Sequence, residues 1–143
     1  MSVSLANGDL IKMAKENEFD LIGHFCDCEK RWDSSLSVNI KEKYPLSYNV
    51  DSDSFPMDLG EYSICDDYLF KIANIYLFCI DQNIKETVYK ALNQVCFNID
   101  RKYSGSKVGF SYDQLIEIGL EWEQSKKIFI SNFKSAHLTI VKN

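Results

Sequence analysis

The chain has 143 residues, 45% of them hydrophobic, and a formal net charge of −5. This length and composition suit one domain with one core, which we expect to span residues 1–143. The 16 basic residues are scattered among 21 acidic ones, which argues against a nucleic-acid-binding protein and favours a basic protein or a small molecule as partner.

The sequence also indicates where the protein works. It has neither a charged-then-apolar leader nor an apolar run near the roughly 20 residues that a membrane span needs, so we expect no membrane association. Its five cysteines are odd in number, and several lie in apolar patterns, as small hydrophobic residues do. We therefore expect a reducing, cytoplasmic location.

The first third of the chain predicts strand, helix, strand and helix. Val3 to Ala6 alternates like a strand, and the turn at Asn7-Gly8 leads into a helix that begins at Asp9. Phe19 to Gly23 is an apolar run typical of a buried strand. A helix follows from Ser34 or Ser35 until Pro45 stops it. The polar connection 24–33 lies between that strand and that helix, where α/β proteins collect ligands.

The middle of the chain predicts a loop, two strands and the longest helix. Asn49 to Asp58 is rich in Asp and Ser, which favours a loop. Glu61 to Cys65 and Tyr68 to Ile80 have the composition of strands. Asn83 and Glu86 form a capping-box pattern before an amphipathic helix that we place at Ile84 to Arg101.

The last third predicts strand, helix and strand. Lys107 to Phe110 is a strand candidate, and Ser111 with Gln114 is a second capping-box pattern. The helical spacing continues through Leu115, Ile118, Trp122 and Phe129, and Gly119 weakens that helix without forbidding it. With a last strand at 138–141, the alternation predicts a three-layer α/β/α domain with a mixed sheet of about six strands.

The order of these motifs resembles the macrodomain family, particularly its short phage and bacterial members. The matching pieces are Gly8-Asp9-Leu10, the strand to His24 with Cys26-Asp27-Cys28, Ile40 to Pro45, Leu59 to Tyr62, Asn74-Ile75-Tyr76, Tyr89 to Leu92, and Val108-Gly109-Phe110 with Trp122 downstream. The resemblance implies a macrodomain-like fold and ADP-ribose as the usual ligand. It also implies that Asp9 contacts the adenine amino group, although an Asp in a first helical turn equally serves the helix dipole.

Both phosphate-binding loops depart from the family pattern. Where the first loop should carry glycines, this chain has Asp33-Ser34-Ser35. Where the second should alternate glycines with small residues, it has Gln114 to Ile118, and only Gly119 remains. Asp27 replaces the asparagine typical of hydrolytic members, which removes an amide donor and adds charge. We expect Asp27, Asp33 and Glu117 to place three acids at what is normally an anion site, where like charges repel.

Other chemistry is less well supported. His24, Cys26 and Cys28 could be proposed as metal ligands, but alternate strand residues are too cramped for a closed zinc site, so we expect no metal and no cofactor. A His24/cysteine nucleophile pair lacks a third, orienting group. His137 should pack or hydrogen-bond in the last strand. Trp32 is either a lid on the core or an exposed anchor for a partner.

Three functions remain open. The first is a non-catalytic macrodomain-like binding module, such as a small phage accessory protein that acts on a host factor. The second is a macrodomain that binds ADP-ribose or removes it from proteins, and the third is a pocket that sequesters another nucleotide or sugar. The ligand-binding candidates are Asp9, His24, Asp27, Ser34, Ser35, Gln114 and Trp122, and Trp32 is the partner-binding candidate. We expect no catalytic residue.

Overall fold

A computed structural model describes residues 3–27, 31–53, 58–66, 69–78 and 85–143. These residues form six strands and six helices. The strands are β1 (Val3–Asn7), β2 (Leu21–Asp27), β3 (Tyr62–Asp66), β4 (Lys71–Phe78), β5 (Lys107–Ser111) and β6 (His137–Lys142). The helices are α1 (Leu10–Lys15), α2 (Ser35–Lys43), α3 (Pro45–Asp53), α4 (Lys85–Lys102), α5 (Tyr112–Glu117) and α6 (Trp122–Asn132).

The strands form one mixed sheet in the order β1-β6-β5-β2-β4-β3. Neighbouring strands run parallel except β3, which pairs with β4 in the antiparallel direction at one edge. All seven residues of β2 are buried, as expected for a central strand with helices on both faces. The predicted six-stranded mixed sheet is confirmed.

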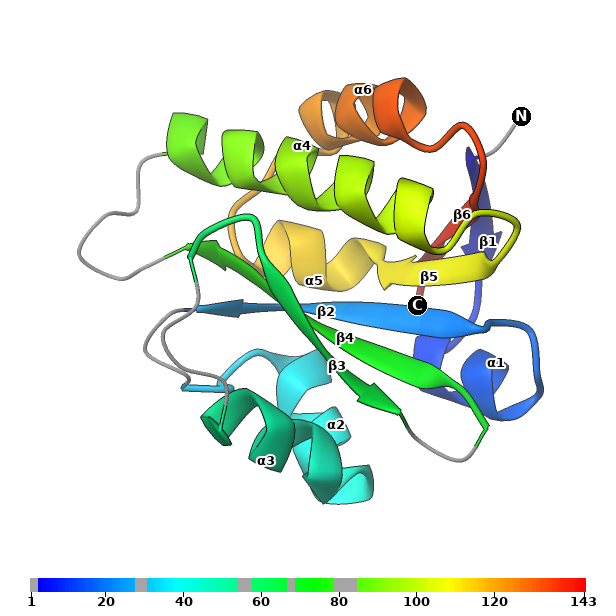
Figure 1. Cartoon of the computed structure of the whole chain (residues 1–143), viewed down its shortest axis with the longest axis vertical. Helices are drawn as coiled ribbons and strands as arrows, with labels where there is room; N and C mark the ends of the chain where they lie inside the picture. The colour runs from blue at the N-terminus through cyan, green and yellow to red at the C-terminus, as the bar shows by residue number, and fades with distance from the viewer. Residues whose placement is uncertain (1–2, 28–30, 54–57, 67–68, 79–84) are drawn as a thin grey trace.

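Helices cover both faces of this sheet. In Figure 1, α4 and α6 lie on one face, while α1, α2 and α3 lie on the other. The longest described helix is α4, as predicted, and it contains the predicted range from residue 85 to Arg101. Asn83 and Ile84 lie outside the described residues. The three-layer α/β/α architecture is confirmed.

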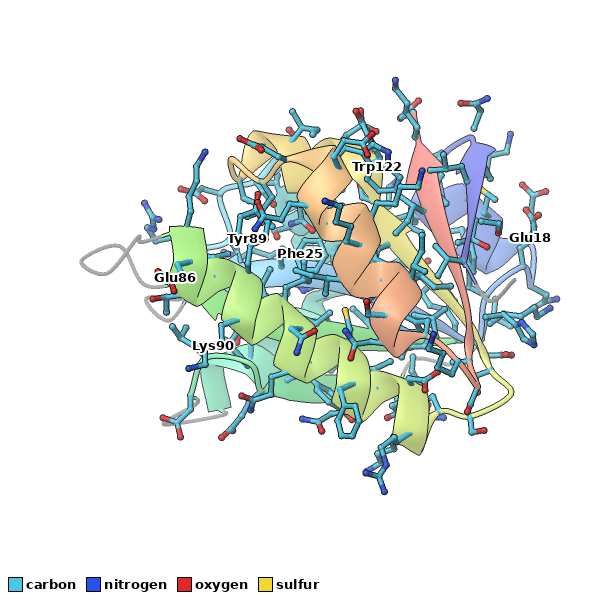
Figure 2. The ribbon with its side chains drawn as sticks, turned by 90° about the horizontal axis from the view of Figure 1, so that it is seen from above. Glu18, Phe25, Glu86, Tyr89, Lys90 and Trp122 are labelled. Carbon is cyan, nitrogen blue, oxygen red and sulfur yellow. The ribbon has the colours of Figure 1, made fainter. Side chains whose placement is uncertain are left out.

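The α4/α6 face is closed by aliphatic and aromatic side chains. Phe110 of β5 is fully buried, and its ring lies 5.5 Å from that of Phe25, 5.9 Å from Phe129 and 6.1 Å from Phe133, measured between centroids. Figure 2 looks onto α4 and α6 and shows Tyr89 on α4 near the start of α6. There the backbone N–H of Glu121 donates to the Tyr89 hydroxyl (2.8 Å), which ties the two helices together.

The other face differs from the prediction in two places. Pro45 ends α2 but also opens α3, because proline is well suited to the first position of a helix. The predicted loop at Asn49 to Asp58 is therefore wrong as far as Asp53, and residues 54–57 lie outside the described residues. In addition, β2 continues to Asp27, so 24–27 belong to the strand and the polar connection begins after them.

The predicted helix after β5 is present but divided. Ser111 caps α5 by accepting a hydrogen bond from the backbone N–H of Gln114 (3.1 Å), as the capping-box pattern predicts. Gly119 then adopts φ 91°, a left-handed conformation that ends the helix, and α6 begins three residues later. Helix thus covers Gln114 to Glu117, as predicted, although it does not continue unbroken to Trp122.

Candidate functional site

A cavity of about 280 Å³ lies where β1, β5 and β6 end and α2 begins. Its floor is apolar, since Leu10, Ile11 and Val141 line it and are buried. The complete lining is Gly8, Asp9, Leu10, Ile11, Ser35, Leu36, Asn39, Ser111, Asp113, Gln114, Glu117, Val141 and Asn143. Among the predicted ligand-binding residues, the structure brings Asp9, Ser35 and Gln114 together in this cavity.

Three carboxylates line the cavity, and each already accepts a backbone N–H of this chain. Asp9 caps α1 by accepting from the N–H of Lys12 at 3.0 Å. Asp113 accepts from the N–H of Asn143 at 2.8 Å. Three backbone N–H groups around the cavity are thus taken by the protein's own carboxylates. Since no lysine or arginine belongs to the described lining, the cavity is acidic.

Glu117 makes the third of these contacts, across the cavity. Its two carboxylate oxygens accept from the backbone N–H of Ser35 at 3.1 and 3.3 Å, and the Ser35 hydroxyl donates to one of them at 3.3 Å. Ser35 is the first residue of α2, where helix geometry leaves N–H groups unpaired and favours negative charge. The end of α5 therefore supplies an internal anion to the start of α2.

Gln114 fills the gap between β2 and β5. Those strands pair only at Leu21 and Ile22, so Phe25 has no backbone partner on β5. The Gln114 side-chain amide takes that place, because its oxygen accepts from the Phe25 N–H (2.8 Å) and its nitrogen donates to the Phe25 carbonyl (3.2 Å). The same nitrogen donates to the Ser34 hydroxyl at 2.8 Å. Gln114 is 1% exposed, and it acts as a wall of the cavity.

The structure corrects the expected placement of acids. Asp27 is buried, and its carboxylate accepts from the backbone N–H of Arg31 (3.2 Å) and from the Arg31 side chain (2.9 Å). Asp33 is exposed and lies 3.5 Å from the same guanidinium. Neither residue lines the cavity, so of the three predicted acids only Glu117 does. The other two form an ion-pair cluster with Arg31, whose single positive charge offsets one of their two negative charges.

His24 lies beneath α2, away from the cavity lining. It is fully buried, and its ring nitrogens contact the Ser37 hydroxyl (2.9 Å) and the Asn74 side-chain oxygen (2.6 Å). Asn74 donates its amide to the Ser47 carbonyl, which fixes its oxygen toward His24, and Nε2 of His24 therefore carries the proton. Burial lowers the pKa of His24 to about 4, against smaller opposing effects of Asn74 and Asp51. This imidazole is neutral and structural.

Trp32 is a lid on the core, and the exposed-anchor interpretation is wrong. Its side chain is buried, and its indole N–H donates to Asp51 at 2.5 Å. Its ring packs edge-on against His24 and Tyr48, with centroids 4.4 and 5.4 Å apart. The backbone of Trp32 has φ 53°, so the buried indole holds this residue in a conformation that is rare outside glycine.

The remaining predicted site residues lie elsewhere. Ser34 is buried as the cap of α2 and accepts from the Ser37 N–H at 3.2 Å. Trp122 lies at the start of α6 (Figure 2). It packs against Tyr112 and Phe129 and does not line the cavity. No group of three His, Cys, Asp or Glu residues that could hold a metal occurs in the described part of the chain, and Cys28 lies outside it.

The sequence analysis missed most of the cavity floor and one of its acids. Leu10 and Ile11 were assigned only to a helix, and Val141 only to a strand. Asp113 was overlooked, although its place between Ser111 and Gln114 in a helix-start pattern put it in the first turn. The capping pattern could have identified Asp113, because the capping residue Ser111 determines which residues lie in the first helical turn, next to the end of β5.

No family model matches the chain, and no curated protein matches it in sequence. Solved structures do match in fold. The macrodomain of Mycobacterium tuberculosis DarG superimposes with a TM-score of 0.78 at 14% identity, covering 97% of this chain and 96% of that one. The macrodomain of Thermus aquaticus DarG gives 0.75 at 12% identity, covering 99% and 97%. Thermosipho africanus DarTG in complex with ADP-ribose gives 0.73 at 13% identity, covering 98% of this chain and 42% of that one.

The fold of this chain is therefore that of a macrodomain, as the order of its motifs predicted. In the described residues, no helix is both long and apolar enough to cross a membrane.

Proposed function

We propose that this macrodomain-fold chain is a non-catalytic binding module whose cleft holds an uncharged ligand of nucleoside size. The observation that carries the proposal is that backbone N–H groups at the cavity already bond to carboxylates of the same chain. Asp9, Asp113 and Glu117 each accept a backbone N–H at the cavity, so a diphosphate would meet three carboxylates and few free donors.

The size of the cavity supports a small ligand. Pockets for drug-sized molecules enclose about 300–1,000 Å³, and this cavity encloses about 280 Å³. Gln114 closes the cavity on the side of β2. One base and one sugar suit this space better than a dinucleotide-like molecule.

The chemistry of the lining favours a base that carries an amino group. Leu10, Ile11 and Val141 offer an apolar surface to a flat ring. Asp9 has two carboxylate oxygens, and the cap of α1 uses one of them. The other can accept a hydrogen bond from an exocyclic amino group, which is the role that the macrodomain resemblance implies for this position. Adenosine is therefore the first ligand to test.

The lining also argues against catalysis. It contains no histidine and no cysteine among the described residues, and so offers no nucleophile paired with an imidazole base. His24 has both ring nitrogens bonded inside the core, and Asp27 is bound to Arg31. Neither can reach a ligand in the cavity without breaking these bonds. We expect no hydrolysis of ADP-ribosylated protein.

A second candidate function is ADP-ribose binding, which the similarity to the Thermosipho africanus complex favours. It requires Glu117 to leave Ser35 and the phosphates to find new donors. Each hydrogen bond to a charged group contributes about 1.5–3 kcal/mol, so the loss of several would outweigh the contact with Asp9. Arg31 is exposed, but its Nε–H bonds to Asp27, its guanidinium lies 3.5 Å from Asp33, and it does not line the cavity.

Isothermal titration calorimetry with adenosine and ADP-ribose distinguishes the two functions. We expect measurable binding of adenosine and at least about tenfold weaker binding of ADP-ribose, a difference of about 1.4 kcal/mol. A micromolar dissociation constant for ADP-ribose that Asp9→Ala abolishes would put the second candidate first. Binding of neither compound would contradict both. A role in phage and a host-protein partner stay predictions that a pull-down from host lysate would test.

A further inference from the structure

The bond between Glu117 and Ser35 joins residues 82 positions apart at the cavity. Both side chains are exposed, so a ligand that enters the cavity can reach them. The bond is made by the carboxylate of a residue at the end of α5, close to the left-handed Gly119. The carboxylate satisfies the Ser35 donor at the start of α2, so a ligand that uses this donor has to compete with Glu117.

Ser35 presents two donors to the cavity, its backbone N–H and its hydroxyl, and both point at one carboxylate. Further along α2, the N–H of Ser37 bonds to the Ser34 side chain and that of Val38 to the Ser34 carbonyl. A phosphate group that binds the two Ser35 donors would have to displace Glu117. It would then still face the displaced negative charge, together with Asp9 and Asp113.

We propose that Glu117 determines the charge specificity of this cleft: its carboxylate occupies the Ser35 donors and excludes phosphate esters, so the cleft selects nucleosides over nucleotides. The choice of ligand rests on the proposed function above. The other two acids do not have this role, because Asp9 and Asp113 bond to the N–H groups of Lys12 and Asn143 and leave Ser35 untouched.

Calorimetry with adenosine and its monophosphate tests the proposal. In Glu117→Ala, which frees both Ser35 donors and removes the charge, we expect affinity for the monophosphate to rise at least about tenfold, the effect of one hydrogen bond to a charged group. The ratio of monophosphate affinity to adenosine affinity should therefore rise, because an uncharged ligand gains nothing from the freed charge-binding donors. Glu117→Gln removes the charge but can still accept from Ser35, and it should give a smaller gain.

Two matched variants separate donor release from loss of charge. Asp113→Asn removes the same charge from the same cavity without freeing Ser35, and it should raise monophosphate affinity by less than about threefold. Ser35→Pro removes both donors at the first helical position, where proline is tolerated, and Ser34 already has the extended backbone (φ −72°, ψ 154°) that precedes a proline. Added to Glu117→Ala, it should abolish the gain. An equal gain in Asp113→Asn, or no gain in Glu117→Ala, would overturn the proposal.

A second readout keeps this test independent of the proposed function. Pyrophosphate is titrated into ¹⁵N-labelled unmodified protein and Glu117→Ala while the Ser35 amide resonance is followed. We expect a saturable shift of that resonance in the variant alone. If adenosine fails to bind but this shift appears, the proposed function is wrong and the role of Glu117 stands. If the Ser35 resonance does not respond in the variant, the role of Glu117 is refuted whatever adenosine does.

Discussion

The two faces of the sheet are closed by different forces. On the α4/α6 face, Phe110, Phe129 and Phe133 pack ring against ring in an apolar core. On the α1–α3 face, the core also contains buried polar side chains that satisfy one another. The α1–α3 face thus adds a specific chain of hydrogen bonds to its apolar contacts, and only the apolar contacts leave a periodic pattern in the sequence.

The polar chain runs from the cavity wall to α3. Gln114 donates to Ser34, Ser34 donates to Ser37 (2.8 Å), and Ser37 meets His24. His24 then bonds to Asn74, which also accepts from the Ser47 hydroxyl at 2.9 Å. Because each member fixes the orientation of the next, the loss of one leaves its neighbours buried and unpaired.

A second polar link holds α3. The carboxylate of Asp51 is fully buried and accepts from the indole of Trp32 and the hydroxyl of Tyr76. Burial, with Asp51 as its hydrogen-bond partner, raises the pKa of the Tyr76 phenol. The connection before α2, the helix α3 and the strand β4 therefore meet at one side chain, on the same face as His24.

The largest expected effect is on the apolar face. Phe110→Ala removes a fully buried ring that contacts three other rings, and truncations of this kind cost about 3–5 kcal/mol of unfolding free energy. Phe97→Ala is the matched control, because Phe97 is 47% exposed and contacts Arg101 at the surface. It should cost at most about 1 kcal/mol. Urea denaturation measures both, and equal losses would show that the α4/α6 face does not depend on packing.

The buried polar side chains of the α1–α3 face should instead make the free energy of unfolding depend on pH. The pKa of His24 is about 4 in the folded chain and ordinarily 6.5, so the unfolded chain binds the extra proton between these values. The contribution of His24 to the free energy of unfolding is therefore fully present above pH 6.5 and is lost as the pH falls toward 4. The total loss is about 3 kcal/mol, of which about 2 kcal/mol falls between about pH 7 and pH 5.

His24→Gln should flatten this part of the pH profile. The other histidine, His137, is exposed, so His137→Gln serves as the matched control. Urea denaturation at the two pH values measures the difference. A profile of His24→Gln as steep as that of the unmodified protein would mean that His24 does not couple the polar face to pH.

Gln114→Leu tests the polar chain where it meets the cavity. Leucine keeps the bulk but leaves the Phe25 N–H and carbonyl without their partner, and unsatisfied buried groups cost about 1–3 kcal/mol. Gln124→Leu, at an exposed position of α6, should change stability by no more than about 0.5 kcal/mol. Chemical denaturation of the two variants tests whether the Gln114 amide takes the place of a neighbouring strand's backbone beside Phe25. Equal losses of unfolding free energy in the two variants would exclude that role.

The sequence predicted those parts of the molecule that depend on periodicity. The alternation of strands and helices indicated the layers, and Ser111 with Gln114 correctly indicated the start of a helix. It did not predict the destination of the Gln114 side chain, because Phe25 lies 89 positions away. The sequence did not predict the burial of Trp32 either. That burial depends on Asp51, which lies in α3, where the sequence pattern predicts a loop. Long-range polar pairs leave no local pattern.

The smallest expected effect separates the two roles of Asp9, as helix cap and as ligand contact. Asp9→Ala removes the side chain that accepts from Lys12 and should cost about 1 kcal/mol of stability, the usual value of such a cap.

Asp9→Asn should cost no more than a few tenths of a kcal/mol, because asparagine caps helices about as well as aspartate does. Asparagine, however, has one carbonyl oxygen, and the cap uses it. Its remaining group is a donor, so the amino group of a base would find no acceptor. We therefore expect Asp9→Asn to keep its thermal stability and to lose at least about tenfold in adenosine affinity by calorimetry. Full adenosine affinity in that variant would show that Asp9 is only a cap, and that the α1–α3 face contributes shape but no base recognition to the cavity.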